Sequence, residues 1–298
     1  MSKHVALLGA ALVGLASCMN NELDTSSQQI AQENENAIQA YVQKNSLNTQ
    51  RTASGLHYLI TTPNPTGKRP AVGEEIEMAY VLSTVPSASN PVGMRVDSSK
   101  KDSSIFLPYG VSLVLPGLEE GLSLMREGEK ATLLMPSYLA FGTQARPNIP
   151  ANTPLRWDVT LLRSRSDDQQ DDDYIAAQKL TVTERAENGL RFIKTKSVAT
   201  GNLPTNGQRV NLRYTGRLIR ATRPFNDNLP LDVTIGQNQV VRGFEEGLRR
   251  LKVGEKATVI FPSSLGYGPE GSRDQATRVF VIPPFSPLIF DLEVVAIQ

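Results

Sequence analysis

The sequence predicts an α+β fold in which one domain occurs twice, each copy being a curved antiparallel β-sheet wrapped around one short α-helix. Three observations lead to this prediction. Residues 117–142 align without gaps on residues 243–268, with 14 identities in 26 positions, and such self-similarity indicates a repeated unit. Several segments alternate apolar and polar residues as half-buried strands do, and one segment in each copy has helical spacing. A length of 298 residues also favours two domains.

The repeat and the shifts in composition divide the chain into five segments. The first copy and the second copy are similar beyond the aligned block, since PLRWDVTLL ends one and PLIFDLEVV ends the other. The predicted limits are 1–17 for a signal peptide, 18–54 for a lipidated tether with a short helix, 55–165 for the first copy, 166–188 for an acidic linker and 189–298 for the second copy.

The elements of each copy follow from periodicity. Residues 208–216, 256–262 and 288–297 read as strands, because apolar or β-branched residues recur there at strand spacing. Phe244, Leu248 and Leu251 lie at i, i+4 and i+7 in the second copy. Leu118, Leu122 and Met125 have the same spacing in the first copy. Each of these segments therefore predicts a short helix with one apolar face turned to the sheet.

The N-terminus has the composition of a secretory signal. Lys3 precedes an apolar run from Val5 to Leu15, and Ala16 and Ser17 then lead to Cys18. The ending LASC resembles a bacterial lipobox, in which the cysteine becomes the lipid-bearing N-terminus and anchors the protein to a membrane. The alternatives are an ordinary signal peptide with an incidental cysteine, or a buried N-terminal helix. Met19 and Asn20 follow the cysteine, and the absence of an aspartate there favours the outer membrane.

Two polar segments connect these parts. In the tether, Ile38, Tyr41 and Val42 fall at helical spacing and suggest one short amphipathic helix. We expect a spacer that lifts the domains off the membrane, the alternative being a helix that forms a dimer. Between the copies, five aspartates lie within residues 167–173, a charge run that reads as a solvated linker.

Composition excludes several kinds of function. Lysine and arginine number 31 against 30 acidic residues, so the chain lacks the broad basic field that nonspecific nucleic-acid binding needs. One cysteine and two histidines leave too few ligands for a thiolate or histidine metal site. We therefore expect no metal, no cofactor and no nucleic-acid partner.

A series of short motifs carries a family resemblance. YTG at 214–216, VVRGFEEGL at 240–248, VGEKATVIFP, GYG at 266–268, and IPP followed by LIFDLEVV occur in order. Together they resemble the FK506-binding-protein (FKBP) type of peptidyl-prolyl cis-trans isomerase, over nearly all of 189–298 and less completely over 55–165. With the lipobox, the chain is similar to exported bacterial lipoprotein isomerases of the cell envelope. Its expected partners are proline-containing unfolded or exported polypeptides.

The activity that the resemblance implies needs neither a nucleophile nor an acid-base pair. Rotation about an X-Pro amide faces a barrier of about 18–20 kcal/mol, because resonance gives the C–N bond partial double-bond character. Water stabilises the planar amide more than the twisted one. An apolar site that removes this water while gripping the proline ring therefore favours the twisted state.

The resemblance places the better site in the second copy. Phe244 would form its floor, Phe225 and Phe290 its walls, and Tyr267 and the Val241 backbone N–H its donors. Asn226 replaces the aspartate common in the family, and Leu231 replaces a common aromatic residue. The alternative is that these aromatic residues simply form the core. The full predicted set is Tyr214, Phe225, Asn226, Val240, Val241, Phe244, Tyr267, Ile282 and Phe290.

The first copy predicts a weaker second site. Val96 stands where the family has a wall phenylalanine, Leu118 stands at the floor, and Phe141 lacks the tyrosine hydroxyl. Trp157 replaces the inner phenylalanine, or packs only in the core. The predicted set is Tyr80, Val96, Asp97, Val114, Leu115, Leu118, Phe141, Ile149 and Trp157.

Two hypotheses for function follow. The first is a lipid-anchored isomerase that assists the folding of exported proteins, with the second copy as the catalyst. The second is a non-catalytic FKBP-like chaperone or peptide-binding lipoprotein, whose two copies hold proline-containing segments with a gain in avidity.

Overall fold

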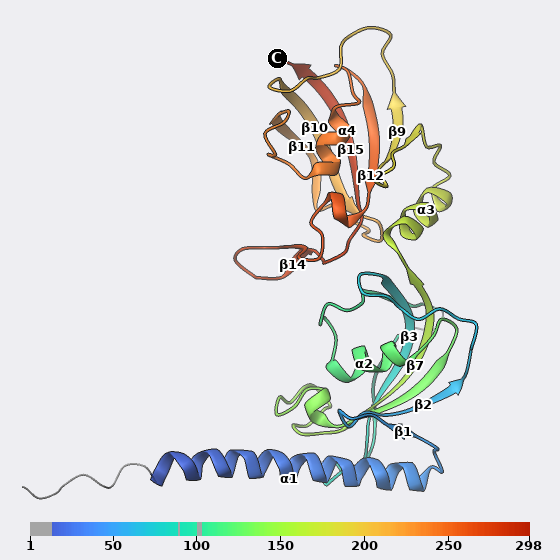
Figure 1. Cartoon of the computed structure of the whole chain (residues 1–298), viewed down its shortest axis with the longest axis vertical. Helices are drawn as coiled ribbons and strands as arrows, with labels where there is room; N and C mark the ends of the chain where they lie inside the picture. The colour runs from blue at the N-terminus through green and yellow to red at the C-terminus, as the bar shows by residue number, and fades with distance from the viewer. Residues whose placement is uncertain (1–13, 89, 100–102) are drawn as a thin grey trace, which may run out of the picture. The chain divides into compact units, whose positions relative to one another are not determined.

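A computed structural model of the chain describes residues 14–88, 90–99 and 103–298, with side chains from residue 26 onward. Figure 1 shows two regions of antiparallel sheet with few helices. They are the two copies of an α+β domain that the sequence predicts. Most of the predicted signal peptide, residues 1–13, lies outside the described residues, and so does the side chain of Cys18.

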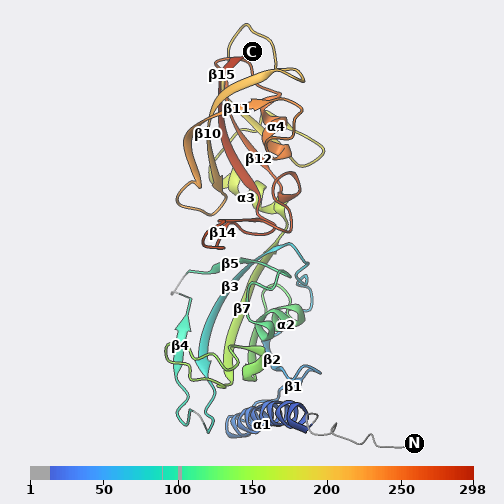
Figure 2. The same ribbon diagram turned by 90° about the vertical axis from the view of Figure 1, so that its left-hand side faces the viewer.

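The first copy contains a seven-stranded sheet in the order β1-β2-β6-β7-β3-β4, with β5 pairing β3. Figure 2 shows β4, β3 and β7 side by side. The buried residues Ile76 and Met78 lie on β3, Leu133 on β6 and Leu161 on β7. The strands are β1 (Gln50–Arg51), β2 (His57–Thr62), β3 (Glu75–Thr84), β4 (Arg95–Ser98), β5 (Ile105–Pro108), β6 (Lys130–Met135) and β7 (Leu155–Arg165).

The second copy repeats this strand order. Its six-stranded sheet runs β11-β10-β15-β12-β9-β8, so each strand has a counterpart in the first copy. The strands predicted at 208–216, 256–262 and 288–297 are found as β10, β12 and β15. The strands are β8 (Glu184–Arg185), β9 (Arg191–Lys196), β10 (Arg209–Leu218), β11 (Asn226–Thr234), β12 (Lys256–Phe261) and β15 (Leu288–Ile297), and β13 (Ser272–Arg273) pairs with β14 (Phe280–Ile282) separately.

One short helix packs against each sheet, as predicted. These helices are α2 (Pro116–Leu124) and α4 (Arg242–Leu248). Leu248 of α4 is fully buried. The helix lies very close to β12, because a Cβ atom at Gly243 would lie 2.4 Å from Cγ of Phe261. Glycine at this position therefore allows the helix to pack on an aromatic strand.

Helix α1 (Gly14–Lys44) corrects the prediction for the tether. It has 31 residues, where the sequence predicted one short helix around Ile38. The predicted spacer is wrong from about Asn34 onward, because this part packs on the first copy. Ile38 is fully buried against Val85 and Leu134, and Nε2 of His57 lies 3.1 Å from a carboxylate oxygen of Glu35.

Helix α3 (Asp167–Ala177) corrects the prediction for the acidic linker. Ser166 and Gln169 form a capping box at its start, and Asp171 has no exposed surface. Arg191 on β9 is also buried, and its Nη1 lies 3.1 Å from Asp171 Oδ2. The run of aspartates is therefore not solvated throughout, because a buried arginine of the second copy pairs with it.

Among the described residues, no helix is both long and apolar enough to span a bilayer. In the same part of the chain, histidine, cysteine, aspartate and glutamate side chains form no group of three that could hold a metal ion.

Candidate functional site

An aromatic cluster forms the inner part of the second copy. It consists of Tyr214 on β10, Phe225 just before β11, Phe244 on α4, Phe261 on β12 and Phe290 on β15. Phe290 is the centre of the cluster, with ring centroids 4.9 Å from Phe244, 5.8 Å from Phe225 and 6.1 Å from Tyr214. The edge-to-face geometry of the first two pairs is the one that aromatic rings prefer.

The cluster is buried on one side and accessible on the other. Phe244, Phe261 and Phe290 are buried, whereas Tyr214 and Phe225 keep part of their surface exposed. The structure also brings four other aliphatic side chains against this core: Leu231, Val240, Val241 and Ile282. The result is an apolar surface of rings and aliphatic groups, with an edge that solvent reaches.

Gly216 is what lets two of the rings approach, and the sequence reading missed its role. A Cβ atom at this position would lie 2.5 Å from Phe225 Cε2 and 2.7 Å from Phe290 Cε1. The reading also missed Phe261, whose ring stacks on Phe290 at a centroid distance of 5.8 Å. Gly216 belongs to the motif YTG and Phe261 to the motif VIFP, so both residues were within the motifs that carry the family resemblance.

Tyr267 lies beyond the buried cluster, in the loop after the short 3-10 turn η2 (Ser263–Leu265). The residue is 39% exposed. Partial burial raises the pKa of Tyr267, and the nearby Tyr214 phenol raises it further. The hydroxyl therefore stays protonated at neutral pH and can donate a hydrogen bond to a carbonyl oxygen.

Asn226 lies at the start of β11, directly opposite Gly216. In the described part of the chain, its side chain and that of Tyr214 share no hydrogen bond. The neighbouring Asp227 does not supply a carboxylate to Tyr214 in place of Asn226, because its carboxylate accepts a hydrogen bond from the Thr215 hydroxyl at 3.4 Å. Thr215 follows Tyr214 in β10, so its side chain points to the opposite face of the sheet.

The corresponding polar pair is intact in the first copy. The hydroxyl of Tyr80 donates to Asp97 Oδ2 at 2.6 Å. Burial, together with this carboxylate, raises the pKa of Tyr80 to about 12. The Tyr80 ring also contacts Trp157, at a centroid distance of 4.9 Å. The indole N–H of Trp157 is buried and has no hydrogen-bond partner within the described residues.

The rest of the predicted first site is less aromatic. Leu118 on α2 and Ile149 are buried, whereas Val114 and Leu115, just before α2, are partly buried. Val96 lies on β4 and is partly buried. Phe141 follows the 3-10 turn η1 (Ser137–Leu139), and the guanidinium of Arg146 lies 5.5 Å from its ring centroid.

Comparison with known families gives one match that occurs twice. The model of the FKBP-type peptidyl-prolyl cis-trans isomerase family matches residues 67–162 and 201–295. The two matched ranges fall within the two copies and together cover more than half of the chain. Helices α1 and α3 lie outside them.

Curated relatives agree with this match. The chain is 29% identical over 205 residues to human peptidyl-prolyl cis-trans isomerase FKBP9, covering 67% of this chain and 32% of the relative. The chain thus spans about a third of that protein's length. It is also 38% identical over 98 residues to Fkbp12 of Drosophila melanogaster, covering 32% of this chain and 85% of the relative.

Two solved structures are similar as well. The three FKBP domains of wheat FKBP73 align at 22% identity and a TM-score of 0.37, covering 83% of this chain and 96% of that one. FkpA from Escherichia coli aligns at 26% identity and a TM-score of 0.35, covering 43% of this chain and 57% of that one.

Proposed function

The chain belongs to the FKBP-type peptidyl-prolyl cis-trans isomerase family, and we propose that it catalyses the isomerisation of X-Pro peptide bonds, chiefly in its second copy. The observation that supports this most is the partly exposed edge of the aromatic cluster, which Tyr214 and Phe225 form. An apolar surface next to a small number of hydrogen-bond donors is what the reaction needs.

The proposed mechanism is desolvation of the amide. Free isomerisation takes tens to hundreds of seconds at 25 °C, and water contributes to the barrier by stabilising the planar, polar amide. When the proline ring packs on Phe225 and Phe290, the amide loses this water, and the twisted state becomes relatively more favourable. No bond is made or broken, and no proton moves.

Two donors would orient the substrate carbonyl groups. The Tyr267 hydroxyl is one. The backbone N–H of Val241 is the other, since Val241 is the N-cap of α4 and its amide is outside the hydrogen-bond ladder of the helix. Val240, Phe244 and Ile282 would complete the apolar surface.

The first copy fits a weaker isomerase or a peptide-holding module. Phe141 provides no hydroxyl, and Val96 provides a smaller wall than a phenyl ring. A hydrogen-bonded Tyr80 and Asp97 nevertheless remain, beside Trp157. In the first copy, the missing hydroxyl and the smaller wall favour the second candidate function, in which a copy holds a proline-containing polypeptide without isomerising its prolyl bond.

A measurement of the rate of prolyl isomerisation distinguishes the two functions. We expect the full chain to accelerate isomerisation of a proline-containing peptide, and Tyr267→Phe and Phe225→Leu to lower kcat/KM. Binding of the same peptide, measured by calorimetry, would persist in a chain that only holds it. Peptide binding without any acceleration by the unmodified chain would refute catalysis and leave the holding function.

We also propose that the chain is lipid-anchored at Cys18 in a bacterial cell envelope, with the outer membrane as the favoured site, and acts on exported polypeptides. The support is the LASC motif after an apolar run. Cleavage before Cys18 would remove only the first four residues of α1, which begins at Gly14. Mass spectrometry of the N-terminal peptide should find a diacylglyceryl cysteine that Cys18→Ala abolishes; an unmodified Cys18 would refute this.

A dimer formed through α1 is a further part of this proposal. Sedimentation of the full chain and of a variant lacking residues 18–33 tests it. The dimer is refuted if the full chain sediments as a monomer.

A further inference from the structure

A helix precedes each copy and contacts it at one and the same place. In the first copy, the backbone N–H of Ser137 donates to Asn34 Oδ1 of α1 at 2.6 Å. In the second copy, the backbone N–H of Ser263 donates to Asp167 Oδ2 of α3 at 2.8 Å. Ser137 and Ser263 are equivalent in the repeat, and each opens a 3-10 turn.

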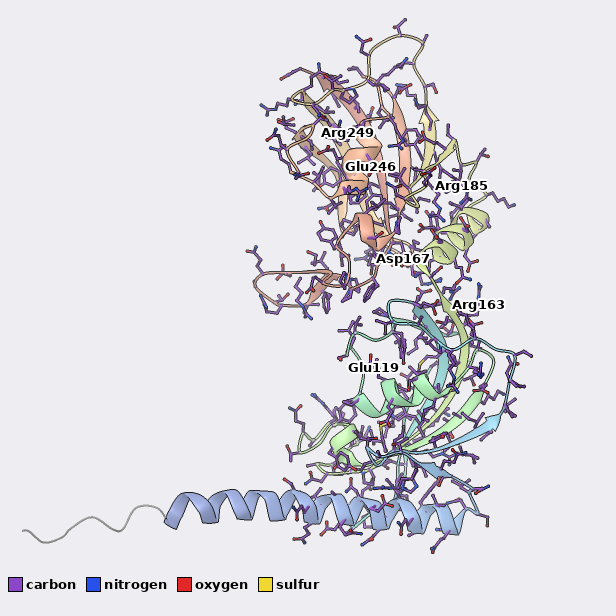
Figure 3. The ribbon with its side chains drawn as sticks, in the orientation of Figure 1. Glu119, Arg163, Asp167, Arg185, Glu246 and Arg249 are labelled. Atoms are coloured by element: carbon purple, nitrogen blue, oxygen red, sulfur yellow. The ribbon has the colours of Figure 1, made fainter. Side chains whose placement is uncertain are left out.

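In the second copy the contact is stronger by one hydrogen bond. The Ser263 hydroxyl also donates to Asp167 Oδ2, at 2.7 Å. Asp167 is the first residue of α3 and is labelled in Figure 3. Ser263 itself is buried, so water cannot easily replace this carboxylate as the acceptor.

Ser263 in turn holds the segment that carries Tyr267. Its carbonyl oxygen accepts from the Gly266 N–H at 2.8 Å and from the Gly268 N–H at 2.9 Å. These two amides flank Tyr267 on either side. In the first copy, the Ser137 carbonyl accepts from the Ala140 and Gly142 amides in the same way, and Phe141 lies between them.

The docking of each helix is also repeated. Leu134 in the first copy packs on Ile38 of α1, and its equivalent Ile260 packs on Ile175 of α3. The basic residue that follows Gly-Leu in each copy, His57 or Arg191, contacts an acidic residue of the helix. The two helices are unlike in sequence and lie outside the ranges that match the family model.

From this repeated geometry, we propose that Asp167 is a positioning residue for the isomerase site of the second copy: through Ser263, it fixes the backbone on both sides of Tyr267 and so the place of its hydroxyl. The proposal rests on the proposed isomerase function. Helix α3 is then a part of the site and not only a connection between the copies, and α1 has the corresponding place in the first copy.

The test compares three variants of the full chain. Asp167→Ala removes both hydrogen bonds to Ser263, and we expect kcat/KM to fall about three- to tenfold. Asp167→Asn keeps an oxygen acceptor, as Asn34 does in the first copy, and should stay within about twofold of the unmodified chain. Asp172→Ala is the matched control, because it removes a carboxylate of α3 that pairs with Arg185 and Arg191 and does not touch Ser263.

A double variant separates positioning from general loss of structure. If Asp167 acts through the Tyr267 hydroxyl, then Asp167→Ala should have little further effect in a Tyr267→Phe background. The proposal would be overturned if Asp167→Ala lowered kcat/KM by the same factor in the Tyr267→Phe background as in the unmodified chain. Equal kcat/KM for Asp167→Ala and the unmodified chain would also overturn it.

Amide hydrogen exchange gives a readout that does not need activity. In Asp167→Ala, the amides of Ser263, Gly266 and Gly268 should exchange faster, while that of Leu292 in β15 stays protected. Unchanged exchange at those three amides overturns the proposal, even if the unmodified chain proves not to be an isomerase. If Asp167→Ala unfolds and Leu292 loses protection, the comparison passes to Asp167→Asn, which must retain slow exchange at the same amides.

Discussion

Replacing Gly216 with alanine tests how the aromatic walls are built. An alanine Cβ atom would lie 2.5 and 2.7 Å from two atoms of the Phe225 ring and 2.7 Å from Phe290 Cε1. Real Cβ atoms do not approach carbon this closely, so at least one ring must move. The backbone at Gly216 has no positive φ, and the effect of alanine is therefore steric and not conformational.

The expected cost follows from these contacts. Insertion of a methyl group into a packed core typically destabilises a protein by about 1–3 kcal/mol. For a domain of about 60–100 residues, each kcal/mol lowers Tm by roughly 4–8 °C. Two of the three close contacts are with Phe225, so Phe225→Val in the same chain should remove much of the strain. We expect a favourable coupling energy of about 0.5–2 kcal/mol between the two changes.

The first copy shows that a larger residue at the position of Gly216 can pack when valine replaces the wall phenylalanine. Leu82 lies at the position of Gly216 and is buried, while Val96 stands where Phe225 does. A larger residue on the strand thus accompanies a smaller wall. The wall phenyl ring of the second copy consequently depends on the glycine opposite it.

The assay is thermal unfolding of the full chain followed by calorimetry and by tryptophan fluorescence. The chain has one tryptophan, Trp157, which lies in the first copy and provides an internal control. Gly216→Ala should lower the calorimetric transition of the second copy and leave the fluorescence transition unchanged. The reasoning is refuted if Gly216→Ala alone costs nothing, or if Phe225→Val destabilises the Gly216→Ala chain as much as it does the unmodified one.

Three other substitutions give separate expectations. Asn226→Asp should let the Tyr214 hydroxyl donate to the new carboxylate, as the Tyr80 hydroxyl does to Asp97 in the first copy, and a crystal structure of the variant would show this bond; a Tyr214 hydroxyl that does not donate to residue 226 contradicts it. Phe141→Tyr, made in a Tyr267→Phe background, should raise kcat/KM about two- to tenfold by returning one donor, whereas no gain would mean that this position does not contact substrate. Burial raises the pKa of Asp171 to about 8, from an ordinary value of 3.8, although the adjacent Arg191 guanidinium lowers it. Between these pH values the carboxyl group is protonated in the native state and accepts a hydrogen bond from Arg191 as a neutral group. The free energy of unfolding should fall as pH rises from about 4 to about 8, and Asp171→Asn should flatten this dependence; equal slopes in both chains would contradict the assignment.

Local patterns were sufficient to predict most of the sheet. The segment 288–297 alternates because one face of β15 packs on the core, and the observed strand has the same limits. The helix positions Phe244 and Leu248 followed from one apolar stripe. These features depend on neighbours along the chain, and the sequence therefore displays them directly.

The two docked helices could not be predicted in the same way. Five aspartates within seven residues look solvated because an isolated carboxylate prefers water. Arg191, about 20 residues away along the chain, changes this by pairing with Asp171 in the folded protein. For α1, Ile38 alone did not reveal that the surface around Leu134 would cover it.

The motifs predict the residues of the candidate site but not its geometry. The motifs identified Phe225, Phe244 and Phe290, and the structure brings their rings together. The close approach at Gly216 and the contact between Asp167 and Ser263 are tertiary features that no local pattern contains.

The two copies contain different parts of the predicted arrangement. The first keeps a tyrosine hydrogen-bonded to an aspartate, through Tyr80 and Asp97, but lacks the phenyl wall and the second hydroxyl. The second keeps the phenyl walls and Tyr267 but has Asn226 in place of the carboxylate. The apolar walls remove water from the amide without any charged group. Orientation of the substrate by a carboxylate, in contrast, needs the charge that Asn226 lacks. Loss of the carboxylate should therefore leave the larger part of the barrier reduction in place, and loss of the walls should not, which is the physical reason to expect turnover in the second copy.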